Sequence, residues 1–374
     1  MGTLANIYNL GIKELRSLLC DKAMLALIAF SFTLSVYSSA TAMPGTLHLA
    51  PIAVADLDQS QLSSRIINAF FRPWFLPPDM ITADEMDTGL DTGEYTFAVN
   101  IPPNFQRDVL AGRQPEIQVN VDATRMSQAF TGNGYIQNII NSEVNTFIQR
   151  YQSSGGSPVD LAVRMRFNPN LEQKWFGGVM AIINNITMLA IVLTGSALIR
   201  EREHGTIEHL LVMPVTPFEI MLAKIWSMGL VVLVVSGLSL VVMVQGVLQV
   251  PIEGSVLLFM LGVALSLFAT TSIGIFMGTL ARSMPQLGLL MILVLLPLQM
   301  LSGGSTPRES MPPLVQDIML SMPTTHFVSL AQAILYRGAG FAVVWPQFLT
   351  LLVIGAVFFG IALLRFRKTI GTMA

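Results

Sequence analysis

The chain has 374 residues, of which 52% are hydrophobic and only 12% charged, with a mean hydropathy of +0.62 and a net charge of −2. Soluble domains carry about 25% charged residues, so this composition excludes an ordinary soluble protein. The balanced charge gives no reason to expect nucleic-acid binding, and the single cysteine, Cys20, excludes an internal disulfide. The chain is therefore a membrane protein.

Six apolar stretches approach or exceed the roughly 20 residues that a membrane-spanning helix needs. The first and fifth are short, and the third is long enough to tilt. The predicted spans cover residues 23–40, 176–199, 222–249, 255–280, 285–302 and 344–364.

The first 22 residues precede the first span and have the periodicity of an amphipathic helix lying in the inner membrane interface. A ragged cytoplasmic extension of the span 23–40 is the alternative. The apolar core followed by Ala40-Thr41-Ala42 also resembles a cleavable signal peptide, but the long helical stretch before residue 23 argues against cleavage. We therefore expect 1–22 to be an interfacial, elbow-like helix and 23–40 to be a retained span.

Residues 41–175 form a polar insert that holds 9 of the 21 Lys and Arg residues and 14 of the 23 Asp and Glu residues. Strand-like alternation and helical periodicity predict a small mixed α/β domain outside the membrane. Asp56 and Asp58 end the first strand and are interpreted as turn residues, because a hard-cation site needs more oxygen ligands. The predicted strands are 51–58, 94–102 and 116–123; the predicted helices are 60–71 and 124–151; a flexible break is predicted at 152–158.

The short loops indicate the orientation of the chain, because cytoplasmic loops are enriched in Lys and Arg. If both termini are cytoplasmic, the opposite short loops contain only Arg308 and Arg337. This asymmetry predicts that residues 41–175 are periplasmic. The cytoplasmic set is Lys13, Arg16, Lys22, Arg200, Arg202, Lys224, Arg282, Arg365, Arg367 and Lys368.

The stretch LIREREHGTIEHLLVMPVTPFE, residues 198–219, is a dense charge cluster between two apolar runs. Gly205 interrupts the preceding helix, Thr206 is suited to cap a new one, and Pro214 ends it after about two turns. Thr216 and Glu219 then form a capping box that starts the third span. The segment encodes a short helix that packs on the membrane interface or binds a partner, and its local chemistry slightly favours the membrane.

Polar residues inside the spans are few. Asn184, Asn185 and Thr187 lie in the second span, where bonding between helices is a more common role than contact with cargo. No ionisable residue lies near the middle of any predicted span, which argues against a self-powered proton- or ion-coupled carrier. It also weakly suggests a lipophilic or amphipathic cargo.

The stretch 303–343 is broken by Gly and Pro and is too interrupted to span. It predicts a re-entrant or surface-lying pair of helices. This pair of helices can be interpreted equally well as a gate that moves or as a structural lid that does not. The residues that mark this element are Gly303, Gly304, Pro307 and Pro323.

Two motifs resemble one known family, the ABC-2 type transporter permeases. REREHGTIEHLLVMPVTPFEI is similar to the family's intracellular signature E-x-x-x-G-T-x-E-x-L-L-x-x-P. LSGGSTPRESMPPLVQDIMLSMPTTHFVSLAQAILYRG, residues 301–338, is similar to the family's outer segment between its last two spans. The order of elements also agrees over essentially the whole chain. One departure is Gln332, near which the family often carries an Arg.

The resemblance implies a membrane all-α permease with six transmembrane helices in 23–40 and 176–374, an inserted extracytoplasmic α/β domain at 41–175, and an outer gate at 303–343. It also implies that 200–219 is a coupling helix that binds a separate ATPase subunit. In that role Glu201, Arg202, Glu203 and Glu208 would make polar contacts. Gly205 and Thr206 would set the bend, Leu210 and Leu211 would be buried against the partner, and Pro214 would end the helix.

None of the five lysines follows a glycine, so the sequence has no G-x-x-x-x-G-K-[ST] phosphate-binding loop. We therefore expect no ATPase activity, no bound cofactor and no metal in this chain, with ATP and magnesium on the partner. The favoured function is the permease of a bacterial inner-membrane ABC exporter of small hydrophobic or amphipathic compounds, as in multidrug efflux, or of envelope material. Expected partners are a second identical or related permease and a periplasmic adaptor. The alternatives are a self-contained carrier or channel, and a membrane-anchored scaffold or sensor.

Overall fold

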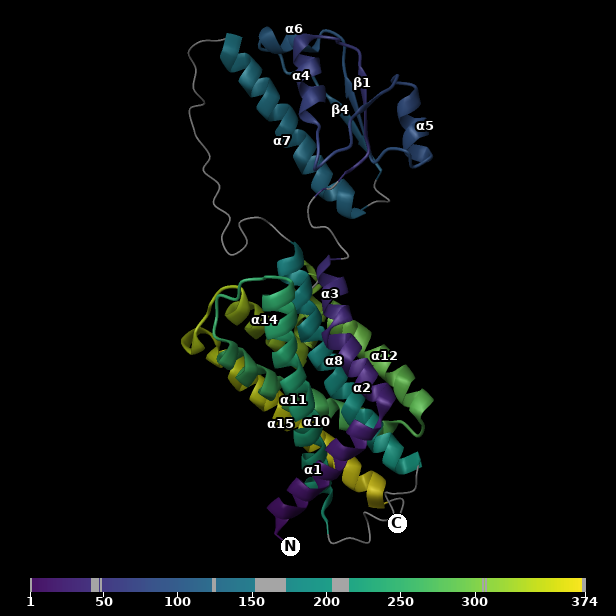
Figure 1. Ribbon diagram of the computed structural model, residues 1–374, viewed down its shortest axis with the longest axis vertical. Helices are drawn as coiled ribbons and strands as arrows, with labels where there is room; N and C mark the ends of the chain where they lie inside the picture. Colours follow the sequence, from purple (N-terminus) through teal and green to yellow (C-terminus); the bar gives the residue numbers. More distant parts are fainter. Residues whose placement is uncertain are drawn as a thin grey trace. The chain divides into compact units, whose positions relative to one another are not determined.

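The protein folds into two compact units, and the chain passes from the first into the second and back again. The first, here called the helical unit, contains Met1–Ala42 and Lys174–Ala374; the second, the sheet unit, contains Met43–Gln173. Each is considered separately (Figure 1). The computed structural model describes residues 2–41, 47, 49–122, 126–151, 173–203, 215–304, 306 and 308–371.

The sheet unit is built on a four-stranded sheet with the order β2-β1-β3-β4. β1 is parallel to β2 and β3, and β4 is antiparallel to β3. The predicted strands at 51–58, 94–102 and 116–123 are present as β1, β3 and β4, whereas the two-residue β2 is too short to show periodicity. The strands are β1 Ile52–Asp56, β2 Asp79–Met80, β3 Phe97–Ile101 and β4 Gln118–Val121.

Helices pack on both faces of this sheet. Alternate side chains of β1 point to opposite faces, so Ile52 and Val54 join a core with α4 and α7, whereas Ala55 contacts the cluster containing Met86 of α5. An ion pair between Arg65 and Glu143 also joins α4 to α7. The helices are α4 Gln61–Ala69, α5 Glu85–Asp91, α6 Phe105–Leu110 and α7 Met126–Tyr151; the predicted break at 152–158 lies outside the described residues.

The N-terminal part of the helical unit consists of α1 Thr3–Cys20, α2 Lys22–Phe32 and α3 Leu34–Thr41. Asp21 separates the first two helices and caps α2, because its side chain accepts a hydrogen bond from the Met24 amide at 3.1 Å. Thr33 interrupts the predicted first span between α2 and α3. Its hydroxyl donates to the Ala29 carbonyl at 2.6 Å, a back-bond that often bends a helix.

Two long helices follow the insert. α8 covers Gln173–Glu203, and α10 covers Pro217–Ser239 before continuing as a π-helix, η1, over Leu240–Val247. The predicted capping box at the start of α10 is confirmed, with Thr216 and Glu219 each accepting a hydrogen bond from the other's backbone amide. The π-helix was not predicted, because its residues are as apolar as the helix before it.

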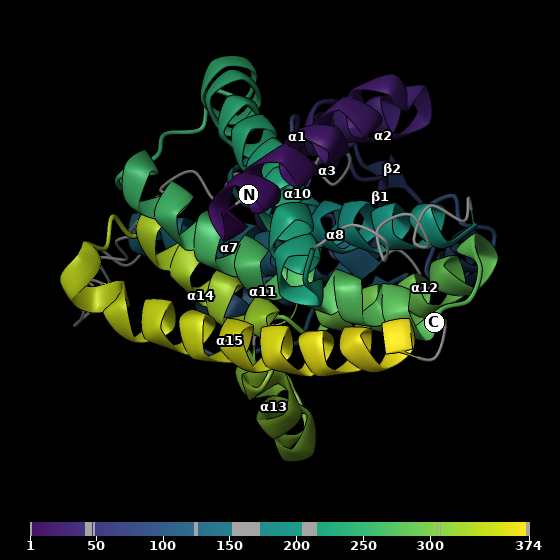
Figure 2. The same cartoon turned by 90° about the horizontal axis from the view of Figure 1, so that it is seen from below.

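The remaining helices are α11 Val256–Leu280, α12 Met284–Met300, α13 Pro313–Leu320, α14 Pro323–Leu335 and α15 Phe341–Gly371, with a short 3-10 turn, η2, at Arg308–Ser310. α12 runs antiparallel along α8. The backbone amide of Met284 bonds to Glu203 at one end, and Gly304, just after α12, contacts the Met180 side chain at the other. Figure 2 shows the packed helices from the end where both termini of the chain lie.

Within the described residues, five helical segments are long and apolar enough to cross a membrane, or six if the bent pair α13–α14 counts as one span. α12 differs from the predicted span 285–302, because it has 17 residues and a length of about 25 Å, short of a hydrocarbon core of about 30 Å. The five segments are Lys22–Thr41, Lys174–Glu203, Pro217–Val247, Val256–Leu280 and Phe341–Lys368.

α13 and α14 meet at an angle of 87° and lie at one end of the helical unit. Phe327 of α14 stacks on Phe259 in the first turn of α11 with ring centroids 6.2 Å apart, and Leu330 contacts Gly262 one turn further on. The end of α14 meets the backbone at Gly254, before α11 begins. The pair therefore remains beside the start of α11, opposite the end where α8 stops.

Candidate functional site

The candidate site lies where α8 ends and α10 begins. These two helices provide both anchors of the charged segment that the sequence predicts to bind a partner. Glu201, Arg202 and Glu203 belong to the described part of this segment. Its remaining predicted contact residues, Gly205, Thr206, Glu208, Leu210, Leu211 and Pro214, lie outside the described residues.

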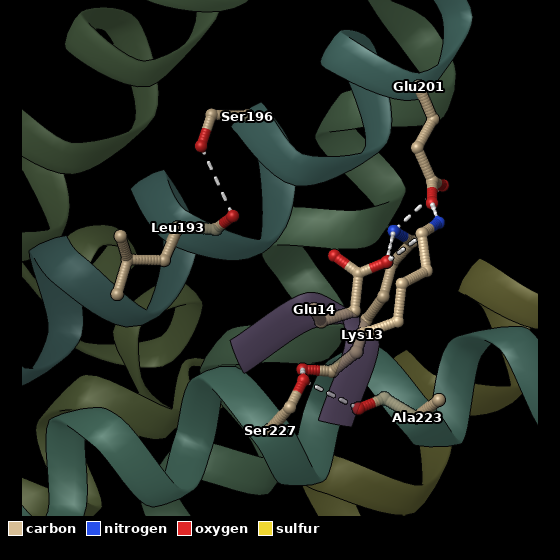
Figure 3. A network of polar contacts seen from close by, with 8 residues as sticks. Lys13, Glu14, Leu193, Ser196, Glu201, Ala223 and Ser227 are labelled. Carbon is tan, nitrogen blue, oxygen red and sulfur yellow. Dashed lines mark hydrogen bonds and ion pairs between the residues drawn. The ribbon is translucent and has the colours of Figure 1, made fainter. Parts of the chain in front are cut away.

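Four charged side chains from three helices form an ion cluster at these anchors, where Lys13, Glu14 and Glu201 converge in Figure 3. Lys224, Glu14 and Glu201 are buried, and the Lys13 side chain is about half exposed. Lys224 of α10 places its Nζ 2.9 Å from Oε1 of Glu14 in α1 and 2.8 Å from Oε2 of Glu201 in α8. Lys13 of α1 places its Nζ 2.7 Å from Oε1 of Glu201 and 3.6 Å from Oε1 of Glu14. Two cations and two carboxylates alternate, so the ionised cluster carries no net charge.

Burial makes the members of the ion cluster depend on one another. Lys224 is 1% exposed, Glu14 5% and Glu201 8%. Leaving one such charge without its partner is strongly destabilising, whereas the complete set satisfies each charge. Burial raises the pKa of Glu14 above its ordinary value, although the adjacent Lys224 opposes the shift. The cluster therefore joins α1, α8 and α10, and removing one buried member alone leaves a partner charge uncompensated.

Neighbouring charged residues of α8 attach its end to further elements. Arg200 Nη1 lies 2.6 Å from Oδ2 of Asp21, between α1 and α2. Arg202 Nη1 donates to the carbonyl of Ala281, just after α11, at 2.9 Å. The Met284 amide at the start of α12 donates to Oε1 of Glu203, also at 2.9 Å. Each charged residue from 200 to 203 thus binds a different part of the helical unit.

α1 packs closely against the first half of α10. Trp226 Nε1 donates to the Ile7 carbonyl at 3.1 Å, and its ring stacks on Tyr8 at a centroid distance of 6.1 Å. Gly11 is required at this crossing, because a Cβ there would collide with the Trp226 ring. Asn6 Nδ2 also donates to Glu219, in the capping box of α10, at 3.2 Å. The predicted N-terminal helix is therefore fixed to the start of α10.

These contacts define a frame around the charged segment. Glu201, two residues before the end of α8, pairs directly with Lys224 in α10, so the helices entering and leaving the segment are joined by a buried ion pair. A displacement of the segment would act on both helices and on α1 together. Because the three helices are joined in this way, they are suited to move together. The side chains of Glu201, Arg202 and Glu203 all have partners within the helical unit.

The predicted polar residues of the second span differ in their surroundings. Asn185 is buried, and its Nδ2 donates to the Ser31 carbonyl of α2 at 2.5 Å, which favours the helix-packing interpretation. The Thr187 hydroxyl donates to Ile183 within α8 at 3.3 Å. Asn184 is half-buried on the same helix.

The predicted outer-gate residues lie at the opposite end of the helical unit. Gly303 adopts a φ of +91° after α12, a conformation that favours glycine. Gly304 allows the Met180 side chain to approach, and Pro323 occupies the first turn of α14. Pro307 lies outside the described residues.

The ion cluster is not predicted from the sequence. Lys13 and Lys224 are predicted only to set the orientation of the chain, and Glu14 has no predicted role. A usable signal was present in IMLAKIWSMGL, where Lys224 stands alone in an apolar helix and so requires a counter-charge when buried. Which carboxylates supply that charge depends on how α1 and α8 pack against α10, because Glu14 lies 210 residues from Lys224 along the chain and Glu201 belongs to a different helix.

The two predicted turn carboxylates of the sheet unit have structural roles. Asp56 accepts hydrogen bonds from the amides of Asp58 and Gln59 and from the Ser63 hydroxyl, and Asp58 accepts one from the Gln106 amide. In the described part of the chain, no group of three or more His, Cys, Asp or Glu residues is arranged to hold a metal ion.

The chain is similar to several transport proteins of Escherichia coli strain K12. It is 84% identical over 374 residues, covering 100% of both chains, to the inner membrane transport permease YhhJ. It is 26% identical over 363 residues to the probable multidrug ABC transporter permease YbhR, covering 96% of this chain and 97% of the relative. Its identity to the probable multidrug ABC transporter permease YbhS is 25% over 373 residues, 96% and 95% of the two chains.

The family model described as ABC-2 family transporter protein matches residues 23–364. The match begins within α2 and continues into α15, so it includes both anchors of the charged segment and the Glu201–Lys224 ion pair that joins them. The chain therefore belongs to the ABC-2 family of transporter proteins.

Proposed function

We propose that this chain is the inner-membrane permease subunit of an ATP-driven exporter, and that a separate ATP-binding subunit acts on it through residues 200–219. The ABC-2 family supports the pairing with an ATP-binding subunit. The observation that carries the mechanism is the buried Glu201–Lys224 pair, which joins the two helices at the ends of the segment. Force applied to the segment would then move α8, α10 and α1 as one body.

In this mechanism the ATPase contacts are divided between two groups of residues. Leu210 and Leu211 provide the apolar anchor, and Glu208 provides a polar contact at its rim, as in other modest protein interfaces. Glu201, Arg202 and Glu203 position the segment, because each already has a partner within the helical unit. This revises the polar-contact role that the family resemblance implied for these three residues.

The proposed topology has six spans, with α12 as the fifth and α13–α14 as a re-entrant pair. α12 is short, but its antiparallel contacts extend along α8 from Glu203 to Met180, which supports a crossing completed by residues 301–304. Both termini and the ion cluster would be cytoplasmic, and residues 41–175 periplasmic. In a Cys20→Ser background, Glu94→Cys should react with an impermeant maleimide only from the periplasm, and Glu208→Cys only from the cytoplasm. The reverse pattern would contradict this topology.

The proposed cargo is a small hydrophobic or amphipathic compound, or envelope material. Two similar proteins carry the description probable multidrug ABC transporter permease, which supports the first class. The functional transporter would contain two permease subunits, identical or related, and a periplasmic adaptor would bind residues 41–175. ATP and magnesium would be held by the ATP-binding subunit, and this chain would perform no catalysis.

The direct test is co-purification of an ATP-binding protein with the full chain. Glu208→Arg and Leu211→Asp should each abolish that co-purification and the ATP-driven transport, because they reverse the polar contact or bury a charge in the apolar anchor. Glu94→Arg makes the same charge reversal at an exposed position of the sheet unit and should leave both unchanged. Unaltered ATPase binding by both segment variants would show that the segment is not the docking site.

A further inference from the structure

A polar pocket of about 560 Å³ lies at the end of the helical unit opposite the ion cluster. It is formed by the start of α8, the turn after α12, the first turns of α14 and the start of α15. Phe176 and Tyr336 support one side, with ring centroids 4.8 Å apart and a hydrogen bond from the Tyr336 hydroxyl to the Phe176 carbonyl. Its polar lining includes Arg308, Thr325, His326, Gln332, Arg337 and Gln347.

The two arginines in this pocket are exceptions to the distribution of Lys and Arg among the short loops of the chain. Short loops on the non-cytoplasmic side are normally depleted of Lys and Arg. Arg308 and Arg337 are the only two Lys or Arg residues in the short loops assigned to that side, and both line this one pocket. Among the described residues that line it, none is Asp or Glu. Their convergence therefore requires a reason other than orientation of the chain.

Several polar atoms of the pocket are buried without a hydrogen-bond partner. The Nε atom of Arg308, which can only donate, is one of them. The hydroxyl of Thr325 is another, on a side chain that is 7% exposed and lines the pocket. Leaving such buried groups unsatisfied is unfavourable, and more so for charged ones. Both groups can donate to the same acceptor.

The first turn of α14 adds positive potential. Pro323 begins the helix, Met322 provides no side-chain cap, and Thr325 and His326 from this end line the pocket. The amides in the first turn of a helix have no partner within the helix, and the helix dipole favours an anion there. His326 is oriented by its Nε2, which donates to the Leu320 carbonyl at 2.8 Å. Two guanidinium groups, a hydroxyl and a helix start thus surround one volume.

We propose that this pocket binds a phosphate group, held by Arg308, Thr325 and the first turn of α14, with Arg337 beyond the other end of α14 adding positive charge to the same pocket. Guanidinium groups bind phosphate through paired, charge-assisted hydrogen bonds, and a helix start is a common anion site. The volume lies within the range of about 300–1,000 Å³ typical of small-molecule sites. The phosphate can belong to the head group of an anionic lipid or to a soluble anion.

The test measures binding to the full-length chain with two probes. In the first, the chain is reconstituted in nanodiscs of phosphatidylcholine that contain some phosphatidylglycerol. Native mass spectrometry then measures how much phosphatidylglycerol stays bound to the chain after purification. Inorganic phosphate, titrated calorimetrically in detergent, reports a soluble anion. Each probe is applied to the wild type, to Arg308→Gln/Arg337→Gln and to the control Arg16→Gln/Arg282→Gln, which removes two exposed arginines from the other end.

The pocket variant should bind at least one probe about tenfold or more weakly than the wild type, because it lacks the charge-assisted hydrogen bonds of the two guanidinium groups. The control should match the wild type. Loss of phosphatidylglycerol alone would identify a lipid head group, and loss of inorganic phosphate would identify a soluble anion. The Arg308→Lys/Arg337→Lys variant keeps both positive charges and should bind with intermediate affinity. It serves as a control for misfolding of the glutamine variant. Equal binding by the pocket and control variants, or no binding of either probe to the wild type, would overturn the proposal.

Discussion

The two ends of the helical unit differ in how their charged side chains are paired. At the end of α8, Lys224 meets Glu14 and Glu201 within 2.9 Å, so each charge is satisfied inside the protein. At the opposite end, Arg308 before α13 and Arg337 after α14 line one pocket whose described lining contains no carboxylate. The first arrangement is suited to holding helices in place, and the second to receiving a ligand. The pairing of charges, and not their density alone, therefore separates the two ends.

Removing one member of the ion cluster should have the largest effect. Lys224→Met leaves the buried carboxylates of Glu14 and Glu201 with only Lys13, so we expect a loss of about 3–5 kcal/mol in the free energy of unfolding. Denaturant unfolding of the detergent-solubilised chain, followed by tryptophan fluorescence, measures this loss.

Two controls distinguish the ion cluster from a general effect of losing a lysine. Lys22→Met removes an exposed lysine from the same end and should be nearly neutral. Lys224→Met combined with Glu14→Gln and Glu201→Gln should recover most of the lost stability, because no buried carboxylate then lacks its partner. A loss below about 1 kcal/mol for Lys224→Met would mean that the cluster does not hold the helices together.

The crossing of α1 and α10 gives a smaller effect. Gly11→Ala places a methyl group against the Trp226 ring and should cost about 1–3 kcal/mol in unfolding free energy. Gly288→Ala is the matched control, because a Cβ at that helical position meets no other atom within 4 Å. That change should be neutral or slightly stabilising, since glycine is a poor helix former. Equal results for the two glycines would contradict the close packing of α1.

The smallest effect is expected for Arg200→Gln. Its ion pair with Asp21 is short, but both side chains are about one-quarter exposed, so solvent screens the attraction. A cost of about 1 kcal/mol or less is expected, decreasing further in high salt. A cost as large as that of Lys224→Met would show that the partly exposed pair, and not the buried cluster, fixes the end of α8.

Local chemistry in the sequence predicts much of this fold. The Thr216–Glu219 capping box depends on residues only three apart in the chain. β1 coincides with a short β-branched run and β3 with an alternating one, so both strands are also visible in the sequence. The Thr33 break and the π-helix at Leu240–Val247 are not visible, because the surrounding residues remain apolar and helical. The short fifth apolar stretch, predicted at 285–302, is present as α12, because Ser302, Gly303 and Gly304 mark its end in the chain itself.

The sites were less predictable than the fold. Glu201 was singled out, but its partner Lys224 was not, because their pairing depends on how α1, α8 and α10 pack. Arg308 and Arg337 are 29 positions apart in sequence, and only the three-dimensional structure brings them to one pocket. Residue type suggested charged sites, whereas packing determined which charges are paired.

The central claim is that the ion cluster transmits a movement to the opposite end of the helical unit. That movement begins in the segment 200–219 and is driven by ATP hydrolysis in the separate ATP-binding subunit. A spin label at Leu314→Cys on α13, in a Cys20→Ser background, reports on that opposite end, because Leu314 is 73% exposed. The measurement is the change in its electron paramagnetic resonance spectrum when ATP and vanadate are added to the assembled complex. The Lys224→Met/Glu14→Gln variant, in which Glu201 keeps its ion pair with Lys13, should bind the ATP-binding subunit normally, yet show about a tenfold smaller spectral change than the intact chain, because the link between α8 and α10 is lost. A variant that binds the subunit and responds as fully as the intact chain would contradict the claim.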